Sequence, residues 1–519
     1  MVEWLKNAVF YEIYPQSFAD SNADGIGDIQ GIIEHLDYIA ELGCNAIWLN
    51  PCFASPFLDA GYDVSDYMKV APRYGTNADL KRLFDEIHKR GMHVLLDLVP
   101  GHTSWEHEWF RESLKPEKNP CSGRYVWTDD AWTEFEGDEN IRGFLRGMSQ
   151  RNGCVAVNFY AHQPCLNYGC YKVENPSWQQ PMDSEDALAT REAIKDVMRF
   201  WLKMGCDGFR VDMAGSLVKN DPKQEGTIAL WRDFRDFLDR EFPEAAMISE
   251  WGQPDRSLRS GYHMDFMLHF GPSHYTELYH EDDPYFSREG KGNVKAFIDY
   301  YTKCYEPTNG KGMICMPSGN HDMVRLTHWL DDEEVKIVFA FILSLPGAPF
   351  IYYGDELGMR YLKDVVSVEG GYIRTGSRSP MQWNAGPNAG FSEAKADELY
   401  IPIDPDENRP TAEGQMADPN SLYHEVKKLI GIRQETKVLQ SEAQVEFVYC
   451  EENAYPLAYR RFQEEESVLV VVNPSGKDAS FAYDGKLGDV IYQNGKDFTL
   501  EDGVFTIPGA TAVFVKEER

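Results

Sequence analysis

Basic residues are scarce in this sequence. Its 519 residues include 51 Lys and Arg against 84 Asp and Glu, which gives a net charge of −33. Binding to DNA or RNA depends largely on basic side chains that neutralise phosphates, and anionic membrane surfaces attract positive charge in the same way. We therefore expect neither a nucleic acid nor a membrane as a partner.

Paired cysteines and long hydrophobic runs are also missing. The ten cysteines are scattered and include no CxxC pair, which favours reduced, buried thiols over a disulfide framework or a zinc site. The most apolar stretch, 337–353, is broken by prolines and a glycine and is short for a membrane span. Because the first residues lack the basic and apolar regions of a secretory signal, we expect a cytoplasmic protein. We further expect a monomer or a homodimer.

A unit of one helix followed by one buried strand recurs along the chain. In its clearest copy, Leu80, Leu83, Phe84 and Ile87 form one face of a helix, and the apolar run 93–99 follows. Repeated units of this kind predict right-handed crossovers, a parallel sheet and an α/β fold. The predicted strands begin near Ala8, Ala46, His93, Gly208, Ala246, His263, Gly312 and Ala348.

Eight such units favour a closed (β/α)8 TIM barrel. The alternative is an open, doubly wound sheet, but no glycine-rich dinucleotide fingerprint follows an early strand. Long irregular segments follow the third and eighth strands, and an alternating, β-rich pattern after about Val445 predicts a small antiparallel domain. We divide the chain into barrel parts at 1–102 and 185–434, with an irregular insertion at 355–420, an inserted subdomain at 103–184, and a C-terminal β domain at 435–519.

Polar side chains stand at the ends of several predicted strands, where barrel enzymes carry their chemistry. Any one of them could be a helix cap or a salt-bridge partner, but acids at the same place in successive units favour an active site. These polar residues are Asp97, His102, Arg210, Asp212, Glu250, His321 and Asp322.

Two carboxyl groups at one site suit glycoside transfer. In a retaining enzyme, an ionised acid attacks the anomeric carbon and a protonated acid ~5–5.5 Å away gives its proton to the leaving oxygen. Arg210 projects to the same side as Asp212, since residues two apart on a strand share a face. We expect that cation to keep Asp212 ionised.

Four segments resemble, in order, the signature regions of the α-amylase family of glycoside hydrolases: DLVPGH at 97–102, GFRVD at 208–212, SEW at 249–251 and GNHD at 319–322. The resemblance implies that Asp212 is the nucleophile and Glu250 the general acid/base, with Asp322 orienting the ring hydroxyls. It further implies that the sugar next to the scissile bond is bound by Tyr62, Asp63, His102, Arg210 and His321.

Two further segments, YPQSFAD at 14–20 and RSPMQW at 378–383, are similar to the exo-acting, oligo-1,6-glucosidase-like group of that family. There an arginine, read here as Arg378, pairs with the acid read as Asp63 and closes the pocket around one terminal glucose. The alternative for Arg378 is a salt bridge between loop and barrel. A closed pocket suits a terminal residue, whereas an open cleft admits chain interiors.

The resemblance implies a retaining α-glycoside hydrolase that removes terminal α-linked glucose from short α-gluco-oligosaccharides. One alternative is a retaining glucosyltransferase or isomerase, such as a trehalose-synthase-like enzyme, because the same acids serve both reactions. Another is a non-catalytic relative, like the amino-acid-transporter heavy chains, which lack the three acids. Cys165 replaces an acid of the group's pattern, and Met213 stands where the group commonly has a small or β-branched residue tied to linkage preference. Because of Met213, neither an α-1,4 nor an α-1,6 preference carries over.

The segment 20–28 has the spacing of a calcium loop. Side-chain oxygens stand at positions 1, 3, 5 and 9, a glycine at position 6 and a backbone carbonyl at position 7. The glutamate usual at position 12 is absent, and a polar turn is the alternative. Because the exo-glucosidase group has a similar loop, we expect structural Ca²⁺, which Mg²⁺ could replace, and no organic cofactor. The predicted ligands are Asp20, Asn22, Asp24, Ile26 and Asp28.

Overall fold

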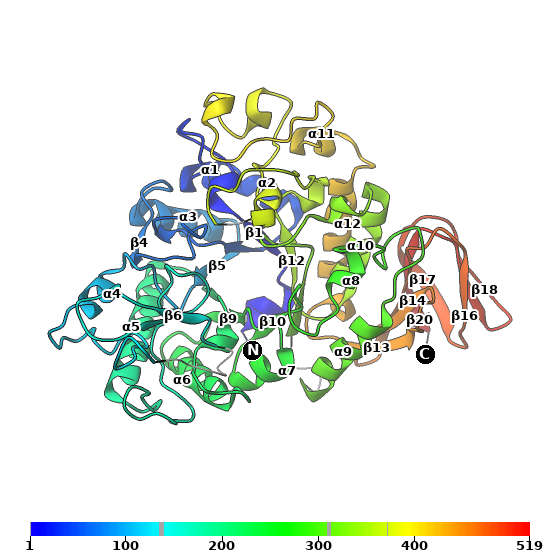
Figure 1. Ribbon diagram of the computed structural model, residues 1–519. Helices are drawn as coiled ribbons and strands as arrows, with labels where there is room; N and C mark the ends of the chain where they lie inside the picture. Colours follow the sequence, from blue (N-terminus) through cyan, green and yellow to red (C-terminus); the bar gives the residue numbers. More distant parts are fainter. Residues whose placement is uncertain (1, 134–139, 309–312, 371, 519) are drawn as a thin grey trace.

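The computed structural model describes residues 2–133, 140–308, 313–370 and 372–518. Its centre is a closed barrel of eight parallel strands, each beginning within two residues of its predicted start, so the predicted TIM barrel is confirmed (Figure 1). In chain order the strands are β1 (Phe10–Ile13), β2 (Ala46–Leu49), β5 (His93–Leu98), β8 (Gly208–Val211), β9 (Ala246–Ser249), β10 (Met264–Phe266), β11 (Met313–Pro317) and β12 (Pro349–Tyr352).

Amphipathic helices cover the outside of the barrel. Helix α3 shows the local cause, since Thr76 and Asp79 form a capping box at its start and its four predicted apolar residues are buried. The helices between and after the strands are α1 (Ile29–Glu34), α2 (Leu36–Leu42), α3 (Asn77–Lys89), α5 (Glu185–Met204), α6 (Glu225–Glu241), α7 (Pro254–Ser257), α8 (Thr276–Tyr279), α9 (Lys295–Tyr305), α10 (Asp332–Ser344) and α12 (Leu422–Glu435). Within the described residues, none of the helices combines the length and apolarity needed to cross a bilayer.

The barrel interior has an apolar lower layer and a polar upper layer. Phe10 stacks on Phe350 with ring centroids 4.2 Å apart, and both belong to a buried cluster with Trp48 and Leu95. Side chains two residues further along a strand point the same way and lie nearer its C-terminal end. The apolar layer therefore supports a polar layer that includes Glu12 and Asp97.

The insertion between β5 and β8 contains α4 (Glu108–Ser113) and a hairpin of β6 (Gly143–Leu145) and β7 (Val155–Val157). A second hairpin, β3 (Phe53–Ala54) with β4 (Asp66–Val70), follows β2. The irregular segment after β12 contains α11 (Ala412–Ala417) and packs on the N-terminal loop, where Trp383 Nε1 donates to Phe18 O at 2.9 Å. The mouth of the barrel is thus built from segments far apart in sequence.

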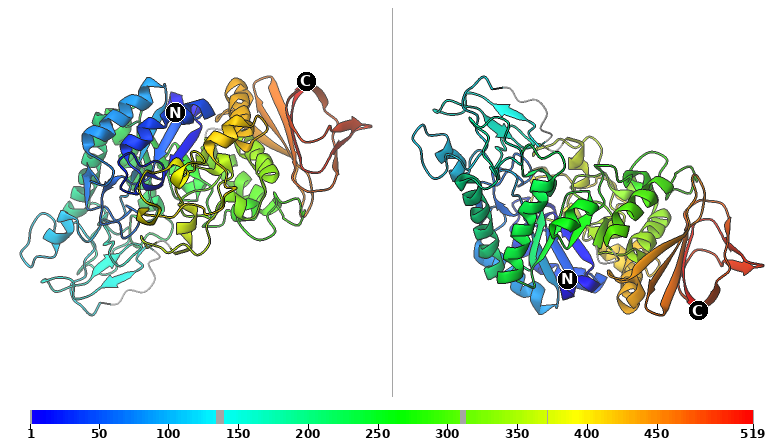
Figure 2. Two further views of the ribbon diagram at one scale, coloured as in Figure 1. Left: turned by 90° about the horizontal axis from the view of Figure 1, so that it is seen from above. Right: turned by 90° about the horizontal axis from the view of Figure 1, so that it is seen from below.

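The predicted C-terminal antiparallel domain is also confirmed, and it lies beside α10 and α12 (Figures 1 and 2). The buried Arg461 joins this domain to the barrel by donating to Ser344 O at the end of α10, next to Leu345 O, which accepts from Arg433 of α12. The strand order in its larger sheet is β13 (Gln444–Tyr449), β14 (Leu457–Gln463), β15 (Glu466–Asn473), β20 (Thr511–Glu518) and β17 (Lys486–Asn494). The strand order in its smaller sheet is β16 (Ala479–Ala482), β19 (Val504–Ile507) and β18 (Thr499–Glu501).

The order of the helices and strands is compatible with our predicted domain boundaries, which divide the chain at 1–102, 103–184, 185–434 and 435–519. These boundaries stay a prediction.

We expect Gly208→Ala to destabilise the barrel. Gly208 begins β8 at φ +143, and an added Cβ would overlap the backbone carbonyl of Ala246 on β9. Such overpacking costs about 1–3 kcal/mol, so the midpoint of thermal unfolding should fall. Gly431→Ala in α12 is the matched control, because nothing lies within 4 Å of its added Cβ and alanine favours a helix by about 0.5–1 kcal/mol. Equal midpoints for the two variants would contradict the packing argument.

Candidate active site

One buried guanidinium joins three carboxyl groups at the top of the barrel. Arg210 Nη1 lies 2.8 Å from Asp97 Oδ1 and 3.2 Å from Asp212 Oδ1, and its Nη2 lies 2.7 Å from Glu250 Oε1. Arg210 reaches this place because β8 carries it on the barrel's inner face, where the ring of Trp48 lies 4.9 Å away. The structure therefore brings together the acids predicted at the ends of three strands.

The carboxyl groups outnumber the cation. Burial raises the pKa of Asp97 to about 6, although Arg210 opposes that rise. Burial, and then the adjacent Glu250 carboxyl, raise the pKa of Asp212 well above its usual range despite Arg210. Our expectation that Arg210 keeps Asp212 ionised is therefore not met in the free site, because one guanidinium cannot balance three acids.

Asp322 lies in a different electrostatic setting. Its Oδ1 is 2.7 Å from Arg374 Nη1 and 2.9 Å from Arg378 Nη2. Burial alone would raise the pKa of Asp322, but His321 and the two arginines hold it well below the usual carboxyl range. The two arginines and His321 therefore favour the ionised form of Asp322.

The predicted pairing of Arg378 with Asp63 is wrong. Asp63 is fully buried and shapes its own loop, accepting hydrogen bonds from Ser55 Oγ at 2.8 Å and from the backbone N–H of Leu58 and Asp59. Arg378 turns instead to Asp322 and, at 3.3 Å, to Glu369.

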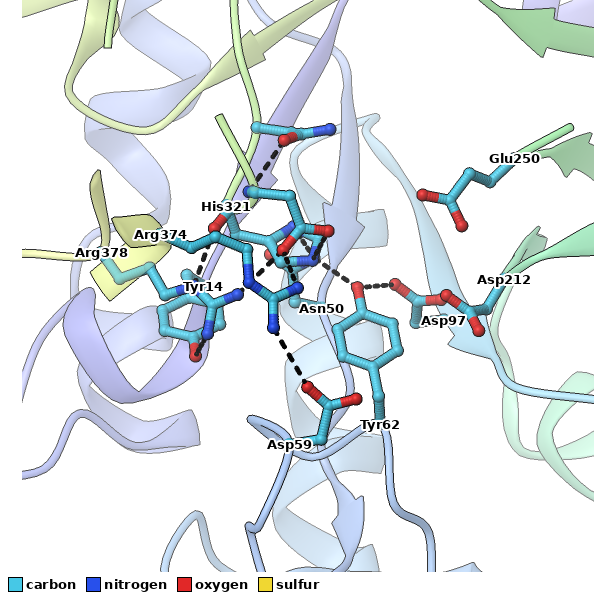
Figure 3. Close-up of polar contacts among 12 residues, drawn as sticks. Tyr14, Asn50, Asp59, Tyr62, Asp97, Asp212, Glu250, His321, Arg374 and Arg378 are labelled. Atoms are coloured by element: carbon cyan, nitrogen blue, oxygen red, sulfur yellow. Dashed lines mark hydrogen bonds and ion pairs between the residues drawn. The ribbon is translucent and has the colours of Figure 1, made fainter. Parts of the chain in front are cut away.

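The pair that spans the pocket is Arg374 with Asp59, at 3.4 Å (Figure 3). Arg374 Nη2 also donates to Tyr160 Oη at 3.1 Å, and Tyr160 Oη donates to Gly370 O. Arg374 and Asp59 each lie four positions before the residue chosen from sequence. Sequence reasoning missed both because a loop's side-chain directions follow from its three-dimensional path and have no fixed period.

His321 is anchored by two residues that the sequence analysis did not single out. Its Nδ1 lies 2.9 Å from Glu12 Oε1 and 3.2 Å from Asn50 Nδ2, and the ring of Tyr62 stacks on it at 5.3 Å. Glu12 and Asn50 each stand two residues after an aromatic residue of the lower layer, Phe10 or Trp48. That period-two relation is the signal that could have identified them.

Tyr62 and His102 both line the candidate cavity. Tyr62 Oη donates to Asp97 Oδ2 at 3.0 Å, which places its ring between the Asp97–Asp212 side and the Arg374 side in Figure 3. Both ring nitrogens of His102 already have partners, Tyr62 O at 3.0 Å and Asn158 Nδ2 at 2.9 Å. Direct sugar contact by His102 therefore stays a prediction.

These side chains surround a cavity of about 750 Å³, within the range of small-ligand pockets. Its polar side is formed by the charged groups described above. Apolar side chains line the cavity as well, and one of them, Met213, adopts a left-handed backbone with φ 43° directly after Asp212. The apolar lining comprises Phe159, Met213, Trp251 and Phe270.

Comparison with known proteins decides the family. The model of the α-amylase catalytic domain matches residues 12–442. The chain belongs to the α-amylase family. It is 31% identical to an oligo-1,6-glucosidase of Parageobacillus thermoglucosidasius over 96% of this chain and 94% of that protein. It is 32% identical to the trehalose synthase/amylase TreS of Mycolicibacterium smegmatis, over 83% of this chain and 76% of TreS. A mutant of the trehalulose synthase MutB has a similar structure, with a TM-score of 0.82 and 27% identity over 99% of this chain and 100% of MutB.

The predicted calcium loop of this α-amylase family member is curled on itself. The carboxylate of Asp20 accepts from the backbone N–H of Ala23 and Gly25, and Asp24 Oδ1 accepts from Ile26 N. The turn at Gly25, the sixth residue of the loop, whose N–H donates to Asp20, the first residue, is compatible with a calcium loop. Asp28 accepts from Gly31 N and so also caps α1. Among the described residues, however, no three Asp, Glu, His or Cys side chains gather as metal ligands, so the metal stays a proposal.

Arg374→Ala should make the family's catalytic reaction sensitive to acid. Removal of a cation 2.7 Å from Asp322 raises the pKa of that carboxyl, because a neighbouring positive charge favours its ionised form. Since Asp322 is expected to act ionised, the acidic limb of kcat/KM against pH should move to higher pH.

Arg374→Lys, which keeps the positive charge, is the matched control and should retain most of the wild-type acidic limb. If the alanine variant has the same acidic limb as the wild type, Arg374 does not set the ionisation of Asp322.

Proposed function

We propose that this protein is a retaining α-glycoside hydrolase that removes terminal α-linked glucose from short α-gluco-oligosaccharides by double displacement. The observation that carries the proposal is the contact of Asp212 and Glu250 with the same guanidinium, beside a cavity that Asp322 also lines. Two carboxyl groups held this close are compatible with the short separation, about 5–5.5 Å, of retaining enzymes.

In the first step, the Asp212 carboxylate attacks the anomeric carbon of the terminal glucose while Glu250 donates a proton to the glycosidic oxygen. The bond from carbon to the leaving oxygen breaks, and an ester to Asp212 forms. This division of labour requires one of the two acids to be ionised and the other protonated when the sugar is bound.

In the second step, Glu250, now ionised, takes a proton from water, and the resulting hydroxide oxygen attacks the anomeric carbon. The ester bond to Asp212 breaks, glucose leaves with its original anomeric configuration, and both acids regain their starting states. Arg210 stays within reach of both carboxyl groups and so can stabilise whichever of them is ionised.

The end of the cavity near Asp322 is closed, which supports action at a chain terminus. Arg374 connects Asp322 to Asp59, and Arg378 connects Asp322 to the buried Glu369. A glucan that continued past the terminal sugar would have to displace these ion pairs. The closed end therefore favours a terminal residue over a chain interior.

A retaining glucosyltransferase or isomerase is the second candidate. The aromatic side chains Phe159, Trp251 and Phe270, which line the cavity, could exclude water from the ester intermediate and retain a sugar acceptor. The similarity to a trehalose synthase/amylase and to a trehalulose synthase is compatible with this second candidate. A non-catalytic role has less support, because all three predicted acids are present. Cytoplasmic location and a monomeric or dimeric state stay predictions.

A substrate panel tests the proposal. We expect the wild type to release glucose from at least one of maltose, isomaltose, trehalose, sucrose, maltotriose and an aryl α-glucoside. Asp212→Asn should lower kcat on that substrate by at least about 10³-fold, because the covalent route is lost. Equal thermal unfolding midpoints would show that the variant is folded.

Cleavage of none of these substrates would overturn the glucosidase proposal, and wild-type turnover by Asp212→Asn would overturn the assigned nucleophile. Product analysis at high sugar concentration separates the two candidates. Free glucose as the main product supports hydrolysis, whereas new disaccharides as the main product support the transferase or isomerase.

We also propose that the loop formed by Asp20, Asn22, Asp24, Ile26 and Asp28 holds Ca²⁺, or Mg²⁺ in its place, as a structural ion. Binding to the folded state alone would stabilise it by about 2.7 kcal/mol at a hundredfold excess over the dissociation constant. Ca²⁺ added after chelation should therefore raise the unfolding midpoint of the wild type and leave that of Asp24→Ala unchanged. No difference between the two proteins would remove the metal from the account.

A further inference from the structure

The loop that follows Glu250 is held by one buried carboxylate on the neighbouring strand. Asp265 Oδ1 accepts from the backbone N–H of Trp251 at 3.0 Å and Gly252 at 3.4 Å, and its Oδ2 accepts from Gln253 N at 2.9 Å. The hydroxyl of Ser249, the residue before Glu250, donates to Asp265 Oδ1 at 2.8 Å. These donors flank Glu250 on both sides.

The register of the barrel explains this reach. Asp265 on β10 pairs with Ser249 on β9, while its neighbours Met264 and Phe266 belong to the buried apolar layer inside the barrel. Asp265 therefore points away from the interior, because neighbouring residues on a strand face opposite sides. From there its side chain extends past the end of β9 and meets the chain where it turns toward α7.

The use of Asp265 to accept hydrogen bonds from the backbone of that turn carries a free-energy cost. It is fully buried, and in the described part of the chain it belongs to none of the ion pairs. Burial raises its pKa to about 7 against the four neutral donors. Burial of an acid without a cation costs free energy, which hydrogen bonds offset only in part. We therefore consider a role for Asp265 in catalysis in addition to its role in the fold.

The contacts of the Glu250 side-chain carboxyl indicate what such a role could be. Glu250 Oε2 accepts from Met213 N at 3.0 Å, and Oε1 lies 2.7 Å from Arg210 Nη2. Both contacts demand that the backbone of residue 250 keeps its place relative to β8. A displacement of about 1 Å at a catalytic group can lower the rate about 10²-fold, and the hydrogen bonds to Asp265 oppose such a displacement.

We propose that Asp265 is a positioning residue that aims the acid/base carboxyl of Glu250 at the glycosidic oxygen. The inference rests on the proposed function, in which Glu250 protonates the leaving oxygen. It predicts a selective defect: loss of Asp265 should harm substrates whose leaving group needs that proton and should spare substrates whose leaving group does not.

The test compares two substrates in the same full-length preparations. One is the panel disaccharide that the wild type cleaves fastest, and the other is α-glucosyl fluoride, whose fluoride departs with little need for a proton. The ratio of their kcat/KM values cancels any inactive fraction of protein. Asp265→Asn should lower the ratio of disaccharide to fluoride by at least about tenfold, a part of the 10²–10⁴-fold that a general acid contributes.

Two variants serve as references. Glu250→Gln should lower the ratio furthest. Glu356→Gln should leave it unchanged, since Glu356 is likewise a fully buried carboxyl with a pKa near 7, but it accepts from Tyr11 and Tyr38 on the side of β1. If Asp265→Asn yields no folded protein, Ser249→Ala, which removes one donor to Asp265, is judged by the same ratio.

The outcomes are distinguishable. A wild-type ratio in Asp265→Asn, together with a low ratio in Glu250→Gln, would overturn the positioning role and leave the proposed function intact. A wild-type ratio in Glu250→Gln would instead overturn the acid/base assignment on which both rest. An equal fall in Asp265→Asn and Glu356→Gln would show a general effect of buried carboxyl loss and would also overturn the positioning role.

Discussion

The contact of one guanidinium with three carboxyl groups is the constraint around which this molecule is organised. Arg210 is nearly inaccessible to solvent, and Asp97, Asp212 and Glu250 all lie within 3.2 Å of its nitrogens. One positive charge cannot balance three negative ones in a buried site. Burial, together with this excess of negative charge, raises the pKa of Asp97 and Asp212 despite Arg210.

This cluster depends on the barrel beneath it. A closed ring of parallel strands points every second side chain inward, and the stacked rings of Phe10 and Phe350 fill the lower part. Buried apolar side chains thus lie beneath the polar layer, while residues at the upper ends of the strands line the cavity. The loops contribute further positive charge. Arg374 and Arg378 come from the segment after β12 and form ion pairs with Asp322.

The barrel and the C-terminal sheets could be predicted because their signals are local and periodic. Leu80, Leu83, Phe84 and Ile87 mark a helical face within eight positions, and the run after His93 marks a strand buried on both sides. The placement of Asp97, Arg210, Asp212 and Glu250 followed from the same regularity, since all parallel strands of a barrel end at one face. The choice of Arg378 and Asp63 as a pair failed, because irregular loops have no period from which a side chain's direction can be calculated.

By itself, the sequence determined the fold, the family and the face on which the acids meet, since each depends on short-range patterns or on motifs readable in one dimension. Only the tertiary structure decided that Arg374 reaches Asp59, that Glu12 supports His321, and that Asp265 on β10 holds the loop after Glu250. Those contacts join residues 12 to 315 positions apart. Their geometry depends on where several chain segments come to lie together, and no local pattern encodes that.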